Sequence, residues 1–524
     1  MKKTIALLLA VALLCPLFAA CGDKEQPDPA TGSSETTVQT EPPEDAPDYA
    51  ALETLGDISG EFRILFGYGF KQNDFKAAEE SSTALESAIY RRNAYMKEKY
   101  NIDIVTDEMD SRTQAYDKLF AEYNAGDSTY DAAMMRTAEV AKLASGGCLR
   151  DLNEMPHLDL TKDYWDQRAN ADLSIGGRMY YTTGDIGVVD NMCTHCMLFN
   201  KEMVRQYGFD DPYELVKDDK WTLETLGTMV RAVGEDANQD GVYDENDVYG
   251  LLTWLDNVQA ILAGAGERVC KVNDNGELVL TLYNERVVNL YDDFTALVYD
   301  ESHVFNYQYD RKTADRSPVD VWDKNRVNMF NNNQAMFYFT MLTTVPRHRD
   351  STTDFGILPY PKYDESQKDY GHGIGVNQTA FICVPEMVTN DARTGFVLEE
   401  LSYQGKKLLT PAYYEQTLIG QYTRDEESAD MLDLIFATRV YDVGLYYNIG
   451  KYKDALANMF VNRRTLTTVY ETYRESAEKT IAEINAAFAS QFGAESVDGQ
   501  QSTFCGGSPQ DFSRNSAKGI EKRL

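Results

Sequence analysis

One stretch of the chain has the residue types and spacing of a calcium-binding loop. It begins at Asp236 and follows the pattern D-x-N-x-D-G, with a further carboxylate at the twelfth position. Positions one, three and five place oxygens on one side of a turn, the glycine permits the bend, and the next residue offers its backbone carbonyl. Hard oxygen ligands favour Ca²⁺ over zinc. The expected ligands are Asp236, Asn238, Asp240, Val242, Asp244 and Asp247.

The twelfth position of this loop departs from the usual pattern. Asp247 stands where an EF-hand loop has glutamate, so the side chain has a shorter reach. We expect a structural ion that fixes a loop, and nothing in the sequence indicates that the ion touches a ligand. The alternative is an acidic turn that binds no metal.

The segment Cys193-Thr194-His195-Cys196 is a second pattern that can carry chemistry. A C-x-x-C pair is a redox motif in a thioredoxin setting, but here it directly precedes an apolar strand. Methionine follows Cys196, which excludes c-type haem attachment, and no second C-x-x-C is present for a zinc site. We therefore expect buried cysteines without redox chemistry. The pairing of Cys148, Cys193, Cys196, Cys270, Cys383 and Cys505 is not readable from the sequence.

The composition excludes several classes of function. The 524 residues include 84 Asp and Glu, 50 Lys and Arg and 5 His, which gives a net charge of −34. Nucleic-acid binding is not expected, because it needs a basic surface. So few histidines also make a His-rich zinc or haem site improbable. With 34 tyrosines the chain is rich in side chains that both stack and form hydrogen bonds.

The N-terminus reads as a targeting signal. Lys2 and Lys3 precede an apolar run over residues 5–20, which is too short to span a bilayer comfortably. The run ends in Phe18-Ala19-Ala20-Cys21-Gly22, which resembles a bacterial lipobox except that Phe18 replaces the usual leucine. We expect a signal peptide over residues 1–20 and lipidation of Cys21. The alternative is an ordinary secretory signal with an incidental cysteine.

The segments at the two ends of the chain lack the features of a folded domain. Residues 21–57 are acidic and rich in Ser, Thr, Gly, Ala and Pro, with Lys24 as their only basic residue. Such a stretch buries too little apolar surface to offset the entropy of ordering it, so we expect a disordered tether. Residues 491–524 are expected to form a poorly ordered tail. The protein would then be held at the outer face of the bacterial cell membrane by its lipid alone.

The body of the chain alternates between strand-like and helix-like segments. We expect strands over 62–66, 101–105 and 130–135, with helices over 83–100, 116–124 and 137–143 between and after them. Later segments repeat this order, and a long amphipathic helix over 469–488 comes near the end. This βαβα order predicts an α/β fold with a parallel sheet that has helices on both faces.

Short motifs in a fixed order make the body resemble a family 1 extracellular solute-binding protein, the lipid-anchored receptor of ABC sugar importers. Each motif is weak alone, and their order along one chain carries the resemblance. They are Ala88-Ile89-Tyr90-Arg91-Arg92-Asn93, Asn124-Ala125-Gly126-Asp127, Gly146-Gly147-Cys148-Leu149-Arg150-Asp151-Leu152, Met197-Leu198-Phe199-Asn200-Lys201, Trp221-Thr222, Asn333-Gln334-Ala335-Met336 and Phe355-Gly356-Ile357-Leu358-Pro359-Tyr360-Pro361.

The resemblance implies a two-lobed, periplasmic-binding-protein-like α/β fold with a hinge and an interlobe cleft. Lobe 1 would take residues 58–184 and 373–428, and lobe 2 would take 185–372 and 429–490. The first crossing between them would lie near residues 178–191. The implied partners are a carbohydrate, in particular an oligosaccharide, and the subunits of an ABC permease. We expect a monomer that has no enzymatic activity.

Candidate ligand contacts follow from this resemblance and from position. Sugar rings stack on aromatic planes, and their hydroxyl groups need polar partners, so Trp254 with Asp256 and Asn257 offers both. Tyr68 follows the first strand, where ligands approach open α/β sheets. The remaining candidates are Arg136, Trp322, Tyr338, Tyr446 and Tyr447. Each of these side chains would otherwise serve in core or surface packing.

Two other functions stay open at this stage. One is a lipoprotein that binds a non-sugar ligand such as a peptide. The other is a surface glycoside hydrolase, because a pair of the many acidic residues could act as acid and nucleophile. The sequence contains no G-x-S-x-G, H-E-x-x-H or P-loop motif. Neither possibility can be tested by spacing along the chain.

Overall fold

The computed structural model describes residues 46–67, 73–79, 83–308, 322–414 and 426–490. The expected signal peptide, Cys21 and most of the tether therefore lie outside the described residues, as do the C-terminal tail, Tyr68 and Cys505. The described residues all belong to one compact unit. Among the described residues, no helix is both long enough and apolar enough to span a membrane.

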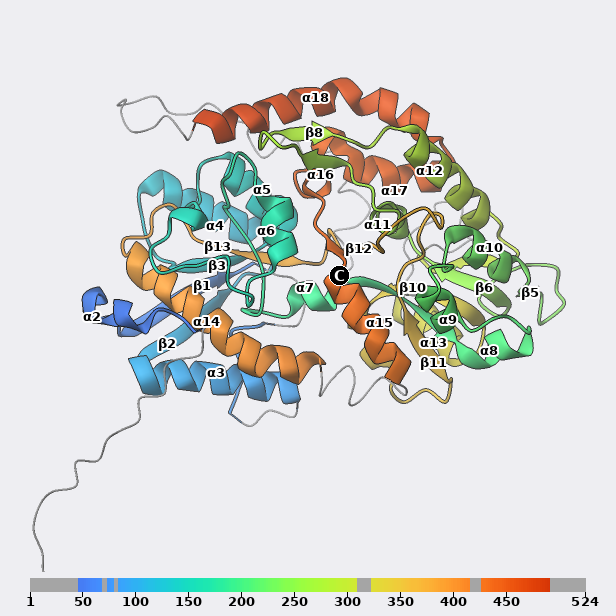
Figure 1. Ribbon diagram of the computed structural model, residues 1–524, viewed down its shortest axis with the longest axis horizontal. Coiled ribbons are helices and arrows are strands. Elements are labelled where there is room, and N and C mark those ends of the chain that lie inside the picture. Colours follow the sequence, from blue (N-terminus) through green and yellow to red (C-terminus); the bar gives the residue numbers. More distant parts are fainter. Residues whose placement is uncertain (1–45, 68–72, 80–82, 309–321, 415–425, 491–524) are drawn as a thin grey trace, which may run out of the picture. The chain divides into compact units, whose positions relative to one another are not determined.

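A four-stranded sheet lies at the centre of the first lobe, in the order β13-β3-β1-β2. Its strands are β1 (Gly60–Phe66), β2 (Ile102–Glu108), β3 (Ala132–Arg136) and β13 (Ala380–Cys383). The first three run parallel, as the alternation of strands and helices predicts, and β13 returns from a distant part of the chain to pair antiparallel with β3. Helices α3 (Ala84–Tyr100) and α14 (Asp391–Pro411) lie on one side, and α4 (Arg112–Ala125) and α5 (Thr137–Ser145) on the other (Figure 1).

Local sequence explains where the helices of this lobe start and stop. Thr83 caps α3, because its hydroxyl accepts a hydrogen bond from the Glu86 amide at 3.1 Å. Asn101 ends the helix in the left-handed conformation, with φ of 53°, and the chain then turns directly into β2. The expected helix over 83–100 and the following strand are confirmed.

The N-terminal part of the described chain packs onto this lobe. Tyr49 belongs to a short 3₁₀ turn (Tyr49–Ala51). The Lys99 ammonium group lies over its ring, with the nitrogen 4.4 Å from the ring centroid. Its hydroxyl reaches Oε1 of the buried Glu400 at 3.5 Å. The folded body therefore includes residues before the first strand.

The second lobe is built on a sheet of six strands in the order β11-β4-β10-β6-β5, with β9 also paired to β6. The strands are β4 (His195–Asn200), β5 (Gly234–Glu235), β6 (Val248–Thr253), β9 (Val304–Asn306), β10 (Ala335–Met341) and β11 (Phe355–Leu358). Strands β6, β9 and β10 are parallel, whereas β4 is antiparallel to β10. The carboxyl ends of the three parallel strands therefore meet at one edge of the sheet.

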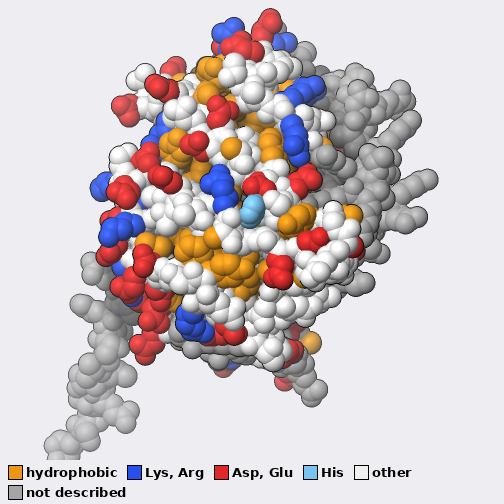
Figure 2. Space-filling view, turned by 90° about the vertical axis from the view of Figure 1, so that its right-hand side faces the viewer, with side chains coloured by type: hydrophobic (Ala, Val, Ile, Leu, Met, Phe, Trp, Pro, Cys, Tyr) orange, Lys and Arg blue, Asp and Glu red, His pale blue; other side chains and the backbone are white. Residues whose placement is uncertain are grey.

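Further helices and strands surround these sheets. They are α2 (Leu52–Leu55), α6 (Gln167–Leu173), α7 (Val189–Met192), α8 (Lys201–Gln206), α9 (Pro212–Lys217), α10 (Leu223–Arg231), α11 (Asn257–Gly264), α12 (Glu285–Val298), α13 (Trp322–Asn331), α15 (Glu426–Ala437), α16 (Val443–Tyr446), α17 (Tyr452–Asn462), α18 (Leu466–Ser490), β7 (Cys270–Val272), β8 (Leu278–Leu280), β12 (His372–Gly373) and β14 (Arg439–Val440). Helix α18 packs against β8, α12 and α17 (Figure 1). On the face shown in Figure 2, acidic and basic side chains are interspersed with apolar ones.

The two sheets have separate strand sets, which fixes the architecture. All strands of the first sheet fall within residues 60–136 and 380–383, and all strands of the second fall within 195–358. Two described segments connect the sheets: residues 189–194 through α7 lead into β4, and residues 372–378 through β12 lead to β13. A third segment, residues 438–442 through β14, leads from α15, which packs on β11, to α16 and pairs with β12. We call these three the crossing segments. The exact limits of the two lobes stay predictions.

Candidate functional site

The three crossing segments meet at a junction between the lobes. Thr194 and Ile374 form an antiparallel bridge, and the Gly375 amide donates to the Cys193 carbonyl at 2.8 Å. Strands β12 and β14 pair in parallel, with His372 opposite Arg439. Backbone hydrogen bonds therefore link the first segment to the second, and the second to the third.

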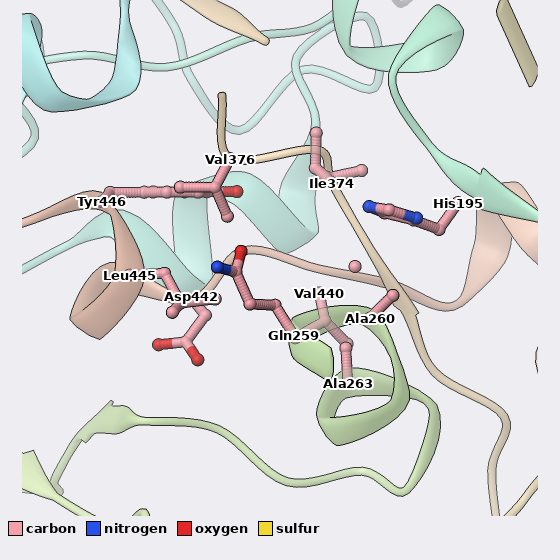
Figure 3. A pocket seen from close by; sticks show the side chains of 11 residues that line it. His195, Gln259, Ala260, Ala263, Ile374, Val376, Val440, Asp442, Leu445 and Tyr446 are labelled. Atoms are coloured by element: carbon pink, nitrogen blue, oxygen red, sulfur yellow. The ribbon is translucent and has the colours of Figure 1, made fainter. Parts of the chain in front are cut away.

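A small cavity lies within this junction. Side chains from different elements line it, among them His195 of β4, Gln259 of α11 and Tyr446 of α16 (Figure 3). Its volume of about 20 Å³ is enough for roughly one water molecule. A cavity of this size is too small for a sugar ring.

Two buried histidines at the junction are uncharged at neutral pH. Burial lowers the pKa of His195 to about 3 and that of His372 to about 3. The His372 ring accepts the Tyr360 amide hydrogen bond at Nε2, and its Nδ1 lies 2.7 Å from the Thr438 hydroxyl. The His372 imidazole thus acts as a neutral hydrogen-bonding group that links the second crossing segment to the third.

Of the three neighbouring candidates at the end of β6, Asp256 reaches the junction. Its carboxylate accepts a hydrogen bond from Nε2 of Gln378, which precedes β13 of the other sheet, at 3.3 Å. Burial raises the pKa of Asp256, and the bond from Gln378 opposes that shift. Asn257 is buried, with its amide engaged by Thr253 and by the Tyr360 hydroxyl, each at 2.8 Å.

Trp254 and Tyr338 belong to one buried aromatic cluster. Trp254 is 2% exposed and stacks on Tyr307, with ring centroids 6.3 Å apart and planes at 16°. Tyr338 is fully buried and meets the same Tyr307 ring edge-on at 5.7 Å. The cluster fills the region beyond the carboxyl ends of β6 and β9, so these two rings pack in the core of the second lobe.

The remaining candidates lie in different places. Arg136 ends β3 and directly precedes α5, half-buried at the carboxyl edge of the first sheet. Tyr446 lines the junction cavity, whereas Tyr447 packs beside Tyr181. Trp322 is the first residue of α13, and its side chain lies outside the described residues. The structure thus brings Asp256 and Tyr446 to the junction, and the assignment of ligand contacts stays a prediction.

Sequence reasoning missed several polar side chains at this junction. The Lys453 ammonium donates to Asn377 Oδ1 at 3.2 Å, and Gln259 donates to the Lys453 carbonyl at 2.9 Å. Gln378 Oε1 and the Tyr446 hydroxyl are buried without a hydrogen-bond partner among the described residues, as is Asn306 Nδ2 at the end of β9. The position of Asn377 and Gln378 just before a strand was a usable signal, but nothing in the sequence singles out Lys453.

A buried charge network at the junction was also missed. Arg439 of β14 donates to Asp190 Oδ2 at 3.1 Å and pairs with Asp166, the residue that caps α6. Burial raises the pKa of Asp190 to about 6, and the nearby guanidinium opposes this shift. Asp185, whose carboxylate accepts a bond from the Thr410 hydroxyl, has its pKa raised by burial to about 6. Sequence spacing gives no sign that these residues meet.

The expected calcium loop connects β5 to β6, away from the junction. The Asp236 carboxylate accepts bonds from the amides of Asp240 at 3.2 Å and Gly241 at 2.8 Å, and Gly241 has a φ of +79°. Asp247 closes the loop by accepting bonds from Ala237 at 2.9 Å and Asp244 at 2.7 Å. Within the described part of the chain, no three His, Cys, Asp or Glu side chains group in a way that could hold a metal ion. The calcium ion stays a prediction.

The cysteines of the C-x-x-C segment are buried, as expected. Cys193 and Cys196 are 1% and 0% exposed, and both are free thiols. Burial raises the pKa of the Cys196 thiol well above its usual value, which disfavours the reactive thiolate. The other described cysteines, Cys148, Cys270 and Cys383, are likewise free and buried.

Comparison with known proteins identifies the fold. No protein-family model and no curated protein sequence matches the chain. Among solved structures, the galacto-N-biose-/lacto-N-biose I-binding protein of the ABC transporter from Bifidobacterium longum, in complex with lacto-N-biose, is similar at a TM-score of 0.54 and 11% identity, over 81% of this chain and 98% of that one.

Two further structures give the same result. The cyclic alpha-maltosyl-1,6-maltose binding protein from Arthrobacter globiformis matches at a TM-score of 0.53 and 13% identity, over 82% of this chain and 100% of that one. An ABC substrate-binding protein from Listeria monocytogenes, in complex with cycloalternan, matches at a TM-score of 0.50 and 14% identity, over 83% of this chain and 99% of that one. The chain therefore has the two-lobed α/β fold of ABC solute-binding proteins, which confirms the fold class expected from the sequence.

Proposed function

We propose that the protein is an extracytoplasmic solute-binding lipoprotein that captures a carbohydrate, in particular an oligosaccharide, in the cleft between its lobes and delivers it to an ABC transporter permease. The two-lobed fold carries this proposal. The similar structures named above are binding proteins, and those from Bifidobacterium and Listeria are complexes with lacto-N-biose and cycloalternan. Capture would need no covalent chemistry, because a ligand that prefers one arrangement of the lobes shifts the population toward it.

The polar groups at the junction support a hydroxyl-rich ligand. Gln378 Oε1, Asn306 Nδ2 and the Tyr446 hydroxyl are buried and have no partner among the described residues. Leaving a buried polar group without a hydrogen bond is unfavourable, so a ligand that supplies donors and acceptors gains affinity there. Sugar hydroxyl groups do both. Asp256 and Lys453 add one acceptor and one donor at the same junction.

A thermal-shift screen of the full chain in detergent tests the proposal. The ligands would be mono- and oligosaccharides, including lacto-N-biose and α-glucans, with peptides as controls. A ligand at 100 times its dissociation constant should stabilise the native state by about 2.7 kcal/mol. A response confined to saccharides supports sugar capture. A response to peptides alone would replace the proposal by peptide binding, and saccharide hydrolysis during the assay would indicate an enzyme.

The anchor and the ion are parts of the same proposal. Cys21 would carry the lipid that holds the body at the outer face of the membrane, and the acidic tether would separate the two. Calcium would be held by the Asp236–Asp247 loop, whose carboxylate, amide and carbonyl oxygens are the donor types that Ca²⁺ prefers. The loop lies at the start of β6, whereas the junction lies at the end of that strand, so a bound ion would act on stability.

A further inference from the structure

The links among the three crossing segments are of two kinds. The first and second segments share backbone hydrogen bonds, from Gly375 to Cys193 and through the Thr194–Ile374 bridge. The second and third share the β12–β14 pairing. Among the described residues, the third and first segments share no backbone hydrogen bond, and side chains make that link instead.

Arg439 provides most of this side-chain link. One end of its guanidinium donates to Asp190 Oδ2 at 3.1 Å and to Asn191 Oδ1, both on α7 in the first segment. The other end pairs with Asp166. Tyr441, two residues further on, donates from its hydroxyl to Asp166 at 2.7 Å and, more weakly, to Asp190 at 3.4 Å. A single side chain on the third segment thus reaches the first segment and the first lobe.

The partners of Arg439 are held firmly in place. The second oxygen of Asp166 caps α6 by accepting bonds from the amides of Arg168 and Ala169 at 2.8 and 2.9 Å. Asp190 is 2% exposed, and Arg439 itself is 14% exposed. Separating these charges inside the protein would leave them unpaired, which is strongly unfavourable. The flat guanidinium can reach acceptors on two sides at once, whereas a lysine ammonium cannot.

We propose that Arg439 is a positioning residue that restricts bending between the lobes and thereby sets ligand affinity without touching the ligand. Bending between lobes is absorbed by a few residues in the connecting segments. A movement of β14 away from α7 breaks the contacts of Arg439, so the intact network narrows the range of arrangements. A narrower range of lobe arrangements reduces the free-energy cost of ordering the protein when ligand binds. Only this statement about affinity rests on the proposed function.

The test measures the distance between the lobes in the absence of ligand. Spin labels on unnatural residues replace Asp117 on α4 and Thr228 on α10, both exposed, in the full chain. Arg439→Lys keeps the charge but loses the bridging geometry, and the distribution of label distances should broaden relative to the unmodified chain. A distribution of unchanged width overturns the proposal.

Arg393→Lys is the matched control. Arg393 is 11% exposed and also bridges three acceptors, namely Asp131 and the carbonyls of Ile58 and Glu61, but all of them lie within the first lobe. Arg393→Lys should lower the melting temperature as Arg439→Lys does, but it should leave the distribution of label distances unchanged. Equal broadening in both variants would show a general loss of structure and contradict the proposal.

Two further measurements separate the possible failures. If Arg439→Lys does not fold, Tyr441→Phe removes only the hydroxyl that reaches Asp166 and Asp190, and a smaller broadening is expected. An unchanged distribution in this variant overturns the proposal. For a saccharide found in the thermal-shift screen, Arg439→Lys should weaken binding. If the fraction of molecules whose lobes are arranged for binding falls to a tenth, the apparent dissociation constant rises about tenfold. A silent screen would count against the proposed function, while the distances would still decide the role of Arg439.

Discussion

Single residues at the junction show how burial changes acid–base behaviour. Burial raises the pKa values of three carboxyl groups, those of Asp185, Asp190 and Asp442, to about 6; Asp190 and Asp442 are buried, and Asp185 is partly buried. Their hydrogen bonds oppose the shift without cancelling it, together with the guanidinium of Arg439 at Asp185 and Asp190 and that of Arg268 at Asp442. A carboxyl group with a raised native pKa holds its proton longer in the folded than in the unfolded state. These residues therefore make the stability of the folded protein depend on pH.

Asp185→Asn should stabilise the protein at neutral pH. The native pKa of Asp185 is raised from 3.8 to about 6, so its contribution to stability is lost as the pH rises from 4 through 6. Above pH 6 the variant should exceed the original chain by about 1–3 kcal/mol, and near pH 4 the two should agree. Urea unfolding between pH 4 and 8 measures this difference.

Asp163→Asn is the control for this experiment. Asp163 is 67% exposed and forms its ion pair with Lys406 at the surface. Its replacement should shift the curve by less than about 1 kcal/mol at every pH. If Asp185→Asn gave the same small and pH-independent effect, the pKa of Asp185 would not be raised in the folded protein, and the prediction would be wrong.

At the scale of elements, local patterns predicted much of the fold. The expected strands and helices of the first lobe are present because period, caps and turn residues agree there, as Thr83 and Asn101 show for α3. Asp256 was singled out as a polar partner beside Trp254, and Tyr446 as an aromatic candidate; both lie at the junction. The Arg439–Asp166–Asp190 network could not be predicted from local patterns. Arg439 lies more than 200 residues after both aspartates in the sequence, and the three side chains meet only through tertiary packing.

The Asp236–Asp247 loop gives a prediction at the same scale. Extracellular calcium sites bind with dissociation constants of about 0.1–1 mM, so 10 mM Ca²⁺ should stabilise the chain by roughly 1–3 kcal/mol over a chelated sample. Asp236→Ala should abolish that response, because the first ligand position is lost. Thermal unfolding with and without chelator provides the measurement.

Asp274→Ala is the comparison for the loop, because Asp274 is exposed in the turn between β7 and β8. It should leave the calcium response intact. An unmodified chain that melts at the same temperature in calcium and in chelator would remove the ion from the proposal, without affecting sugar capture.

At the scale of the whole molecule, the fold follows from the sequence more securely than the ligand does. The order of short motifs indicated a two-lobed solute-binding fold, and the similar structures have that fold at 11–14% identity. At such identity the cleft side chains are free to differ, so the fold does not determine which sugar binds. Under the proposed function, that choice would depend on polar groups that are buried without a hydrogen-bond partner among the described residues, such as Gln378 and Asn306.

The attachment to the membrane is tested on the whole protein. Cys21→Ala removes the thiol that would carry the lipid, so the protein should move from the membrane fraction to the soluble fraction or the medium when produced in a bacterium. Cell fractionation with detection of the protein measures this. Cys505→Ala, which removes a thiol near the other end of the chain, should stay with the membrane, and retention of Cys21→Ala there would refute lipid anchoring.

The contact of Tyr49 with Lys99 and Glu400 has a practical consequence for producing the protein. A truncated version that starts just before the first strand, for instance at residue 56, would lack Tyr49. Its loss would remove one of the aromatic rings that contact the Lys99 ammonium and leave the buried Glu400 without the phenol hydroxyl. A fragment for crystallisation or calorimetry should therefore begin at Asp45 or earlier, and one cut at residue 56 should melt at a lower temperature for reasons unrelated to the cleft.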